Sequence, residues 1–230
     1  MTGNRMVGAL AAIAVALVAV PAHGQAPGSW PNGTTVVETL HNLSYAASAG
    51  RYDTTTAGLA DYGEVCVYCH TPHGGQQTNA PLWNRNFSSA SYQMYNSTHS
   101  STIDMTVDAA PSGVSMACLS CHDGTVGIDV VINVPNSYAG TGATGTTFGD
   151  IGGVKNLGSD LRNDHPISVA YSTSDDPAFN SVTSIETAGL VLYGGKVQCA
   201  TCHNPHTAAN RPFLRLSNSG SSLCLTCHQK

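Results

Sequence analysis

Apolar residues form only one long run in this chain, close to its amino-terminal end. Met6–Val20 is apolar throughout, whereas the later apolar stretches are short. Val126–Val134 and Ser181–Leu192 have β-like character and predict short strands. The remaining sequence is rich in Gly, Ser, Thr and Asn and poor in aromatic residues, a composition that builds little continuous apolar core. We therefore predict a mostly irregular, coil-rich fold with short helical turns and a few short strands.

The amino-terminal run has the layout of a secretory signal peptide, which we assign to residues 1–24. Met1–Arg5 carries one positive charge, Met6–Val20 is the apolar segment, and small residues precede a cleavage point before Gln25. The mature chain is then an exported protein with no membrane span, because no second apolar run follows. The alternative is an uncleaved amino-terminal anchor.

The pentad C-x-x-C-H occurs four times and uses all eight cysteines of the chain. It is the attachment motif of a c-type haem: the two thiols add to the haem vinyl groups, and the histidine binds the iron. Zinc ribbons and disulfide frameworks are the alternatives, but neither requires a histidine after every second cysteine. We predict four covalently attached haem c groups. The four copies, called sites 1 to 4 below, are Cys66–His70, Cys118–His122, Cys199–His203 and Cys224–His228.

In every site, both cysteines are predicted to form thioethers and the histidine to bind iron as the proximal ligand. The haems then replace the missing apolar core, and the thioether links fasten the loops around them. The predicted thioether residues are Cys66, Cys69, Cys118, Cys121, Cys199, Cys202, Cys224 and Cys227. The predicted proximal ligands are His70, His122, His203 and His228.

The order of motifs repeats, which indicates two dihaem modules. Each half has a lone histidine, a C-x-x-C-H-x-P-H site, a segment running from proline through apolar residues to arginine, and a C-L-[S/T]-C-H site. The proline segments are 81–85 and 212–215, the second shorter by one residue. We divide the chain into 25–135 (an extended arm and the first dihaem module), 136–159 (a Gly-rich connection) and 160–230 (the second dihaem module).

Five histidines remain for the four distal positions on iron. Four of them correspond in pairs between the two halves, and we predict these as the distal ligands: His41, His73, His165 and His206. The fifth, His99, has no counterpart and is predicted to be an exposed loop residue. The methionines Met94, Met105 and Met116 all lie in the first half, and we predict packing roles for them. Bis-histidine ligation of every haem implies low potentials and no open iron site.

The H-x-P-H spacing predicts that one short segment serves two haems. His73 follows His70, and His206 follows His203, by three residues, which is too close to reach the far face of the same haem. The intervening proline stiffens the connection and points the second imidazole at a neighbouring haem. If site 1 lies at one end of the haem row, His73 points outward, to a haem of another subunit. Site 4 is the acceptor expected from the sequence, and such a head-to-tail contact makes a filament.

These motifs carry a family resemblance. The set C-x-x-C-H-x-P-H, C-L-S-C-H-D-G-T, D-H-P-I-S and C-L-T-C-H resembles the doubled-CxxCH multihaem cytochromes of metal-reducing bacteria. Within that group it looks most like the tetrahaem, extracellular, filament-forming (OmcE-like nanowire) cytochromes. The resemblance implies bis-histidine haems in stacked pairs, a coil-rich fold and a distal histidine lent between subunits, a role that His73 matches.

The sequence therefore favours an extracellular electron conduit that passes electrons from haem to haem within a homopolymer, and exchanges them with redox partners. A soluble periplasmic electron shuttle is the alternative. A multihaem reductase of a small oxyanion is less favoured, because it needs an open iron and the chain has no C-x-x-C-K variant. We expect an electron-transfer protein rather than an enzyme. The formal net charge of −5 speaks against nucleic acid as a partner.

Overall fold

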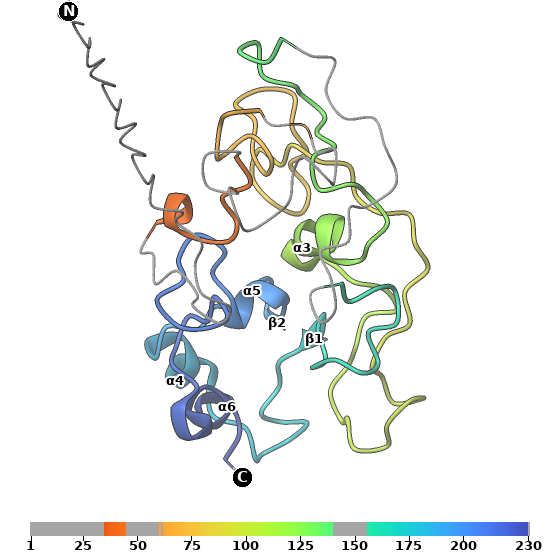
Figure 1. Cartoon of the computed structure of the whole chain (residues 1–230). Coiled ribbons are helices and arrows are strands. Elements are labelled where there is room, and N and C mark those ends of the chain that lie inside the picture. Colours follow the sequence, from red (N-terminus) through yellow and green to blue (C-terminus); the bar gives the residue numbers. More distant parts are fainter. Residues whose placement is uncertain (1–34, 45–59, 61, 140–155, 230) are drawn as a thin grey trace, which may run out of the picture.

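The computed structural model describes residues 35–44, 60, 62–139 and 156–229 (Figure 1). The predicted signal peptide and most of the Gly-rich connection lie outside these residues. Regular elements are few and short, so the predicted coil-rich fold is confirmed. In chain order they are η1 (Val36–Glu38), α3 (Val114–His122), β1 (Val169–Ala170), α4 (Val182–Thr187), β2 (Lys196–Val197), α5 (Cys199–Cys202), η3 (Ser219–Ser221) and α6 (Ser222–Cys227). Among the described residues, no helix is long and apolar enough to cross a membrane.

Three of the four C-x-x-C-H sites form helices. Site 2 ends α3, site 3 forms α5 and site 4 ends α6. Site 1 is a single hydrogen-bonded turn, in which the His70 amide donates to the Cys66 carbonyl at 2.7 Å. After α5 and α6 the chain becomes extended at His203 and His228, so that both helices end at the proximal histidine.

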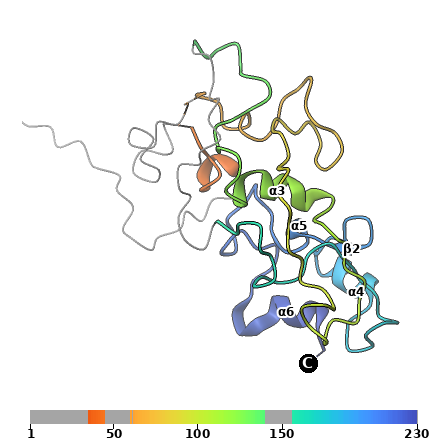
Figure 2. The same ribbon diagram turned by 90° about the vertical axis from the view of Figure 1, so that its right-hand side faces the viewer.

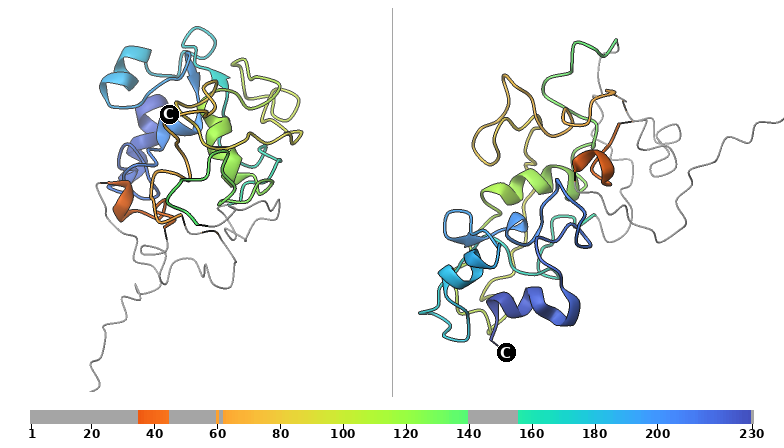
Figure 3. Two further views of the ribbon diagram at one scale, coloured as in Figure 1. Left: turned by 90° about the horizontal axis from the view of Figure 1, so that it is seen from above. Right: turned by 90° about the vertical axis from the view of Figure 1, so that its left-hand side faces the viewer.

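The helices α3 and α5 lie side by side at the centre of the molecule (Figures 1 and 2). Site 1 belongs to the loops at one end, and α6 lies at the opposite end (Figure 3). The strands β1 and β2 pair antiparallel, with Val169 opposite Val197, and a bridge from Val107 to Val169 adds a segment of the first module. The two modules are therefore joined by backbone hydrogen bonds as well as by helix packing.

The apolar core consists of two small clusters rather than one continuous interior. Tyr62, Val67 and Tyr68 form the first, under site 1. Met94, Leu119 and Leu161 form the second, which connects α3 to the second module, and Met116 packs against it. Met105 is also buried. The predicted packing roles of the three methionines are confirmed.

Both predicted strands are wrong. The segment 181–192 contains the helix α4, because the Ser181 hydroxyl accepts a hydrogen bond from the Ser184 amide at 3.2 Å and caps its first turn. Ile185 on this helix is fully buried. The segment 126–134 forms no strand within the described part of the chain. Several of its carbonyls accept hydrogen bonds from the guanidinium of Arg85, so they do not pair with the amides of a neighbouring strand.

Candidate haem-binding sites

The four C-x-x-C-H sites present their thiols without any competing cross-link. All eight cysteines lie in the described ranges, and none of them forms a disulfide. Among the described residues, no group of three or more His, Cys, Asp or Glu side chains is arranged to hold a metal ion.

Sites 2 and 3 are adjacent because α3 packs on α5. The Ser115 hydroxyl accepts a hydrogen bond from the Cys199 amide at 3.0 Å, and it donates one to the Gln198 side chain at 2.5 Å. The thiols of Cys118 and Cys199 interact with each other, which raises the pKa of Cys118 and lowers that of Cys199. Groups attached at these two sites would lie next to each other.

Three pairs of histidine rings lie opposite one another. Their ring centroids are 6.2 Å apart for His41 and His122, 6.2 Å for His70 and His206, and 6.4 Å for His165 and His228. Each pair joins a predicted proximal ligand to a predicted distal one. The pairs connect residues that are far apart in the chain, so the fold and not the local sequence creates them.

These separations test whether the residues fit a haem iron. A metal–imidazole bond is about 2.0–2.1 Å long, and the ring centroid lies roughly 1.1 Å beyond the nitrogen, so two imidazoles on opposite sides of one metal have centroids about 6.2–6.4 Å apart. The three observed pairs match this spacing. The residues present therefore fit bis-histidine haem at three sites; that they bind iron stays a prediction.

The tautomers of these imidazoles also suit iron binding. The Nδ1 atom of His41 lies 3.2 Å from the Pro205 carbonyl, and that of His165 lies 3.0 Å from the Pro166 carbonyl. A carbonyl oxygen only accepts hydrogen bonds, so Nδ1 carries the proton and Nε2 keeps its lone pair. Burial, together with the neighbouring His122, lowers the pKa of His41 to about 4, so that this imidazole stays neutral.

The proline segments of the two modules hold the proximal histidines of sites 1 and 3. Nδ1 of His70 lies 3.0 Å from the Pro81 carbonyl, and Nδ1 of His203 lies 2.9 Å from the Pro212 carbonyl. The next residue, Leu82 or Phe213, has a positive φ in both modules, which turns the carbonyl toward the imidazole. The sequence showed that the segment repeats, but its role as an orienting device was not predicted.

The same geometry corrects the correspondence between the modules. The Asn84 amide donates to the Cys69 carbonyl at 2.8 Å, and the Arg215 amide donates to the Cys202 carbonyl at 2.8 Å. Arg215 is therefore equivalent to Asn84, with no residue missing, and Arg85 has no counterpart in the second module.

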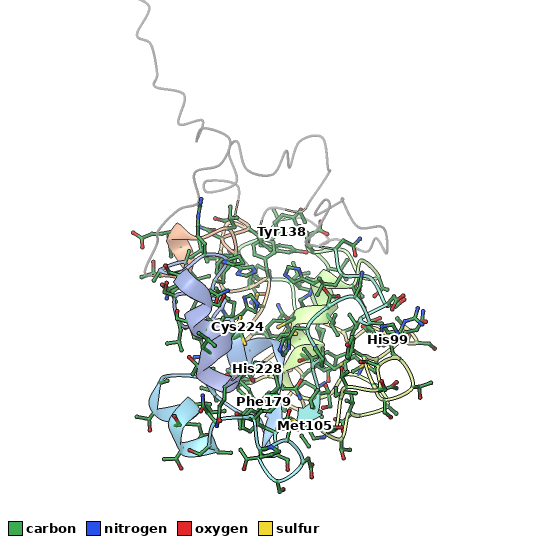
Figure 4. The ribbon with its side chains drawn as sticks, turned by 90° about the horizontal axis from the view of Figure 1, so that it is seen from below. His99, Met105, Tyr138, Phe179, Cys224 and His228 are labelled. Atoms are coloured by element: carbon green, nitrogen blue, oxygen red, sulfur yellow. The ribbon has the colours of Figure 1, made fainter. Side chains whose placement is uncertain are left out.

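Aromatic rings pack against the facing histidines, a feature that sequence reasoning missed. The Phe213 ring centroid lies 4.3 Å from that of His41, and the Phe179 centroid lies 4.4 Å from that of His228. Trp83 lies edge-on to His70. Figure 4 shows Phe179 beside His228. The contacts of Trp83 and Phe213 could have been predicted from the sequence, because both residues lie in the repeated proline segment.

Two of the eight predicted ligands have no facing imidazole in the described part of the chain: the proximal His203 and the distal His73. Burial lowers the pKa of His203, which keeps it neutral like His41. His73 is exposed. Site 4, the acceptor that the sequence suggested for His73, has His165 opposite its proximal histidine. His99 is exposed at the rim of the molecule, as predicted (Figure 4).

Comparison with known families agrees with the geometry. The family model described as the doubled CXXCH motif matches residues 193–230, which contain sites 3 and 4. The chain carries the signature of a multihaem c-type cytochrome. This multihaem cytochrome signature indicates covalently bound haem c and electron transfer. No curated protein matches the chain.

Proposed function

We propose that this chain is an exported tetrahaem cytochrome that moves electrons from haem to haem as the subunit of an extracellular filament. The haem iron would supply the redox chemistry; the protein residues fix the iron ligands and the spacing of the haems. The observation that carries the proposal is the set of three facing histidine pairs, because it fits closed, six-coordinate iron centres suited to electron transfer.

A continuous haem path is supported by the segment 203–206. His203 is the proximal residue of site 3, and His206 faces the proximal His70 of site 1. The Pro205 carbonyl between them accepts a hydrogen bond from His41, which faces the proximal His122 of site 2. One tetrapeptide thus connects three sites, and a rigid connection of this kind keeps the haems close enough for fast electron exchange.

The proposal of a polymer is supported by the two unmatched ligands. Since site 4 already has His165 opposite its proximal residue, we assign the haem of site 3 as the acceptor for His73 of a neighbouring copy. An exposed histidine in one copy and an open distal position in the next make a heterologous contact, and such contacts continue as filaments unless the rotation closes a ring.

An uncovered apolar position is consistent with such a contact. Leu119 in site 2 and Leu225 in site 4 hold the same place in the C-L-[S/T]-C-H motif. Leu119 is 0% exposed and packs with Met94 and Leu161, whereas Leu225 is 50% exposed on α6 at one end of the molecule. A second copy is the occupant that the filament proposal assigns to this face.

The test is electron microscopy of haem-loaded protein sheared from the outside of cells, for the wild type, His73→Ala and the matched control His99→Ala. We expect filaments from the wild type and the control. His73→Ala should keep four haems per chain, measured as pyridine haemochrome, but form only small particles that bind one carbon monoxide per chain at site 3. Unchanged filaments from His73→Ala would overturn the polymer proposal.

The second candidate is a soluble periplasmic shuttle, favoured by the same closed iron centres. Dispersed particles from the wild type, with no carbon monoxide binding, would support it and would mean that His73 finds its iron within its own chain.

A further inference from the structure

Among the residues that the structure describes, Arg85 has the largest fully buried side chain, at 0% exposure. Its Nη1 donates to the carbonyls of Ile128 and Val130 at 2.7 and 3.0 Å. Its Nη2 donates to the carbonyls of Ser120 and Gly127 at 2.9 and 2.6 Å. The Nε atom is the one buried side-chain polar atom without a partner in the described part of the chain.

No carboxylate neutralises this cation within the described ranges, where the two ion pairs are Arg162 with Asp160 and Lys196 with Asp108. All four of its hydrogen bonds go to neutral carbonyls. A buried charge held only by dipoles acts over a longer range than a charge in water, because little solvent screens it. The positive charge of Arg85 therefore acts on the groups that are packed next to its side chain.

Sites 1 and 2 lie beside it. The backbone of the adjacent Asn84 donates to the Cys69 carbonyl at 2.8 Å, and the guanidinium bonds the carbonyl of Ser120, which precedes Cys121. One cation is thus placed between the second thioether residues of two sites.

The other charge close to Cys121 is the buried carboxylate of Asp123, which is bonded to the hydroxyls of Tyr92 and Thr125. Its negative charge acts at site 2 in the direction opposite to that of Arg85.

We propose that Arg85 raises the reduction potentials of the haems attached at sites 1 and 2 above those that bis-histidine ligation alone would set. The step is Fe(III) plus one electron, supplied by an electrode or a redox partner, giving Fe(II). Reduction removes one positive charge from the iron, so a nearby buried cation favours the reduced form. The inference rests on the proposed attachment of haem at both sites.

The experiment is a spectroelectrochemical titration of the haem-loaded protein. Arg85→Gln removes the charge but keeps an amide donor for the carbonyls, and Arg85→Lys keeps the charge. Arg162→Gln, on a partly exposed arginine that pairs with Asp160, changes the net charge equally and serves as the matched control. We expect Arg85→Gln to shift the waves of two haems to lower potential, Arg85→Lys to restore most of that shift, and Arg162→Gln to leave all four waves in place.

Two results would overturn the inference: unchanged waves in an Arg85→Gln protein that retains four haems, or equal shifts in Arg85→Gln and Arg85→Lys. If Arg85→Gln does not fold, the inference is tested on the wild type by paramagnetic NMR, which assigns a reduction potential to each haem. Sites 1 and 2 must then hold the higher potentials, and the reverse order contradicts the role of Arg85. A haem count below four would instead count against the proposed function.

Discussion

The imidazole of His70 faces that of His206 with ring centroids 6.2 Å apart and planes 14° from parallel. His70 belongs to the first module, and His206 follows the first haem site of the second. The two modules therefore share a predicted iron centre, and neither module has a complete set of ligands by itself.

Removing His206 should open one iron. His206→Ala leaves the haem of site 1 with His70 as its single protein ligand, so we expect a high-spin centre that binds one carbon monoxide per chain after reduction. The absorbance change on adding carbon monoxide to reduced protein measures this directly. His99→Ala is the control, since His99 is exposed and faces no iron ligand. If the carbon monoxide uptake of the two variants were equal, His206 would not be a ligand at site 1.

The sequence predicted those features that covalent chemistry determines. The C-x-x-C-H spacing located the short helices at sites 2 to 4, and the repeat selected histidines that the fold brings into facing pairs. The pairing itself could not be predicted, because His41 and His122 meet only through contacts between distant segments. That His73 reaches site 4 of another subunit stays a prediction, and the sequence did not show that His165 lies opposite His228 at that site.

The misassigned strands have a similar explanation. Residues 126–134 are mostly apolar and β-branched, as strands usually are, but the buried guanidinium of Arg85 bonds three carbonyls of this segment. A long side chain from another part of the chain thus replaced a neighbouring strand. In the segment 181–192, the Ser181 hydroxyl caps the first turn and so favours a helix. This capping signal is local and cannot be seen in the pattern of apolar residues.

The leucines of sites 2 and 4 provide a matched pair for measuring the core. Leu119→Ala removes a side chain that is fully buried with Met94 and Leu161, so we expect it to lower the free energy of unfolding by about 2–5 kcal/mol. Leu225→Ala, at the equivalent position on α6, removes a half-exposed side chain and should change the stability of the monomer by about 0.5 kcal/mol or less. Denaturant titration followed by far-UV circular dichroism compares them; equal losses would contradict the structural difference between the sites.

Gly75 should tolerate no side chain. A Cβ atom added there would lie 2.8 Å from the backbone carbon of Leu82 and 2.9 Å from the Thr71 side chain. The Thr71 amide donates to the Leu82 carbonyl, so Gly75→Ala would push these two segments of the loop apart. That shift would move the Pro81 carbonyl, which lies next to Nδ1 of His70. We expect a loss of stability and a disturbed low-spin spectrum at site 1. Gly194→Ala separates crowding from backbone strain, because nothing lies within 4 Å of its added Cβ but its φ of +62° disfavours a side chain; it should cost stability and leave the spectrum of site 1 unchanged.

Acid should weaken the contact between β2 and the loop before α3. Lys196 bonds both carboxylate oxygens of Asp108, at 2.7 and 2.6 Å, and together with the Ser112 hydroxyl it lowers the pKa of Asp108 below its ordinary value of 3.8. A carboxyl whose pKa is lower in the folded state stabilises the fold above its unfolded pKa. That contribution disappears as the pH falls through 3.8 toward the folded value.

Asp108→Asn should therefore be less stable than the wild type near neutral pH, by about 1 kcal/mol or less for this partly exposed pair. The difference between the two proteins should shrink as the pH drops below about 4, because the wild-type carboxyl then becomes neutral as well. Thermal unfolding measured at a series of pH values gives both curves. A difference in melting temperature that stays constant down to low pH would show that Asp108 acts through its shape and hydrogen bonds rather than through its charge.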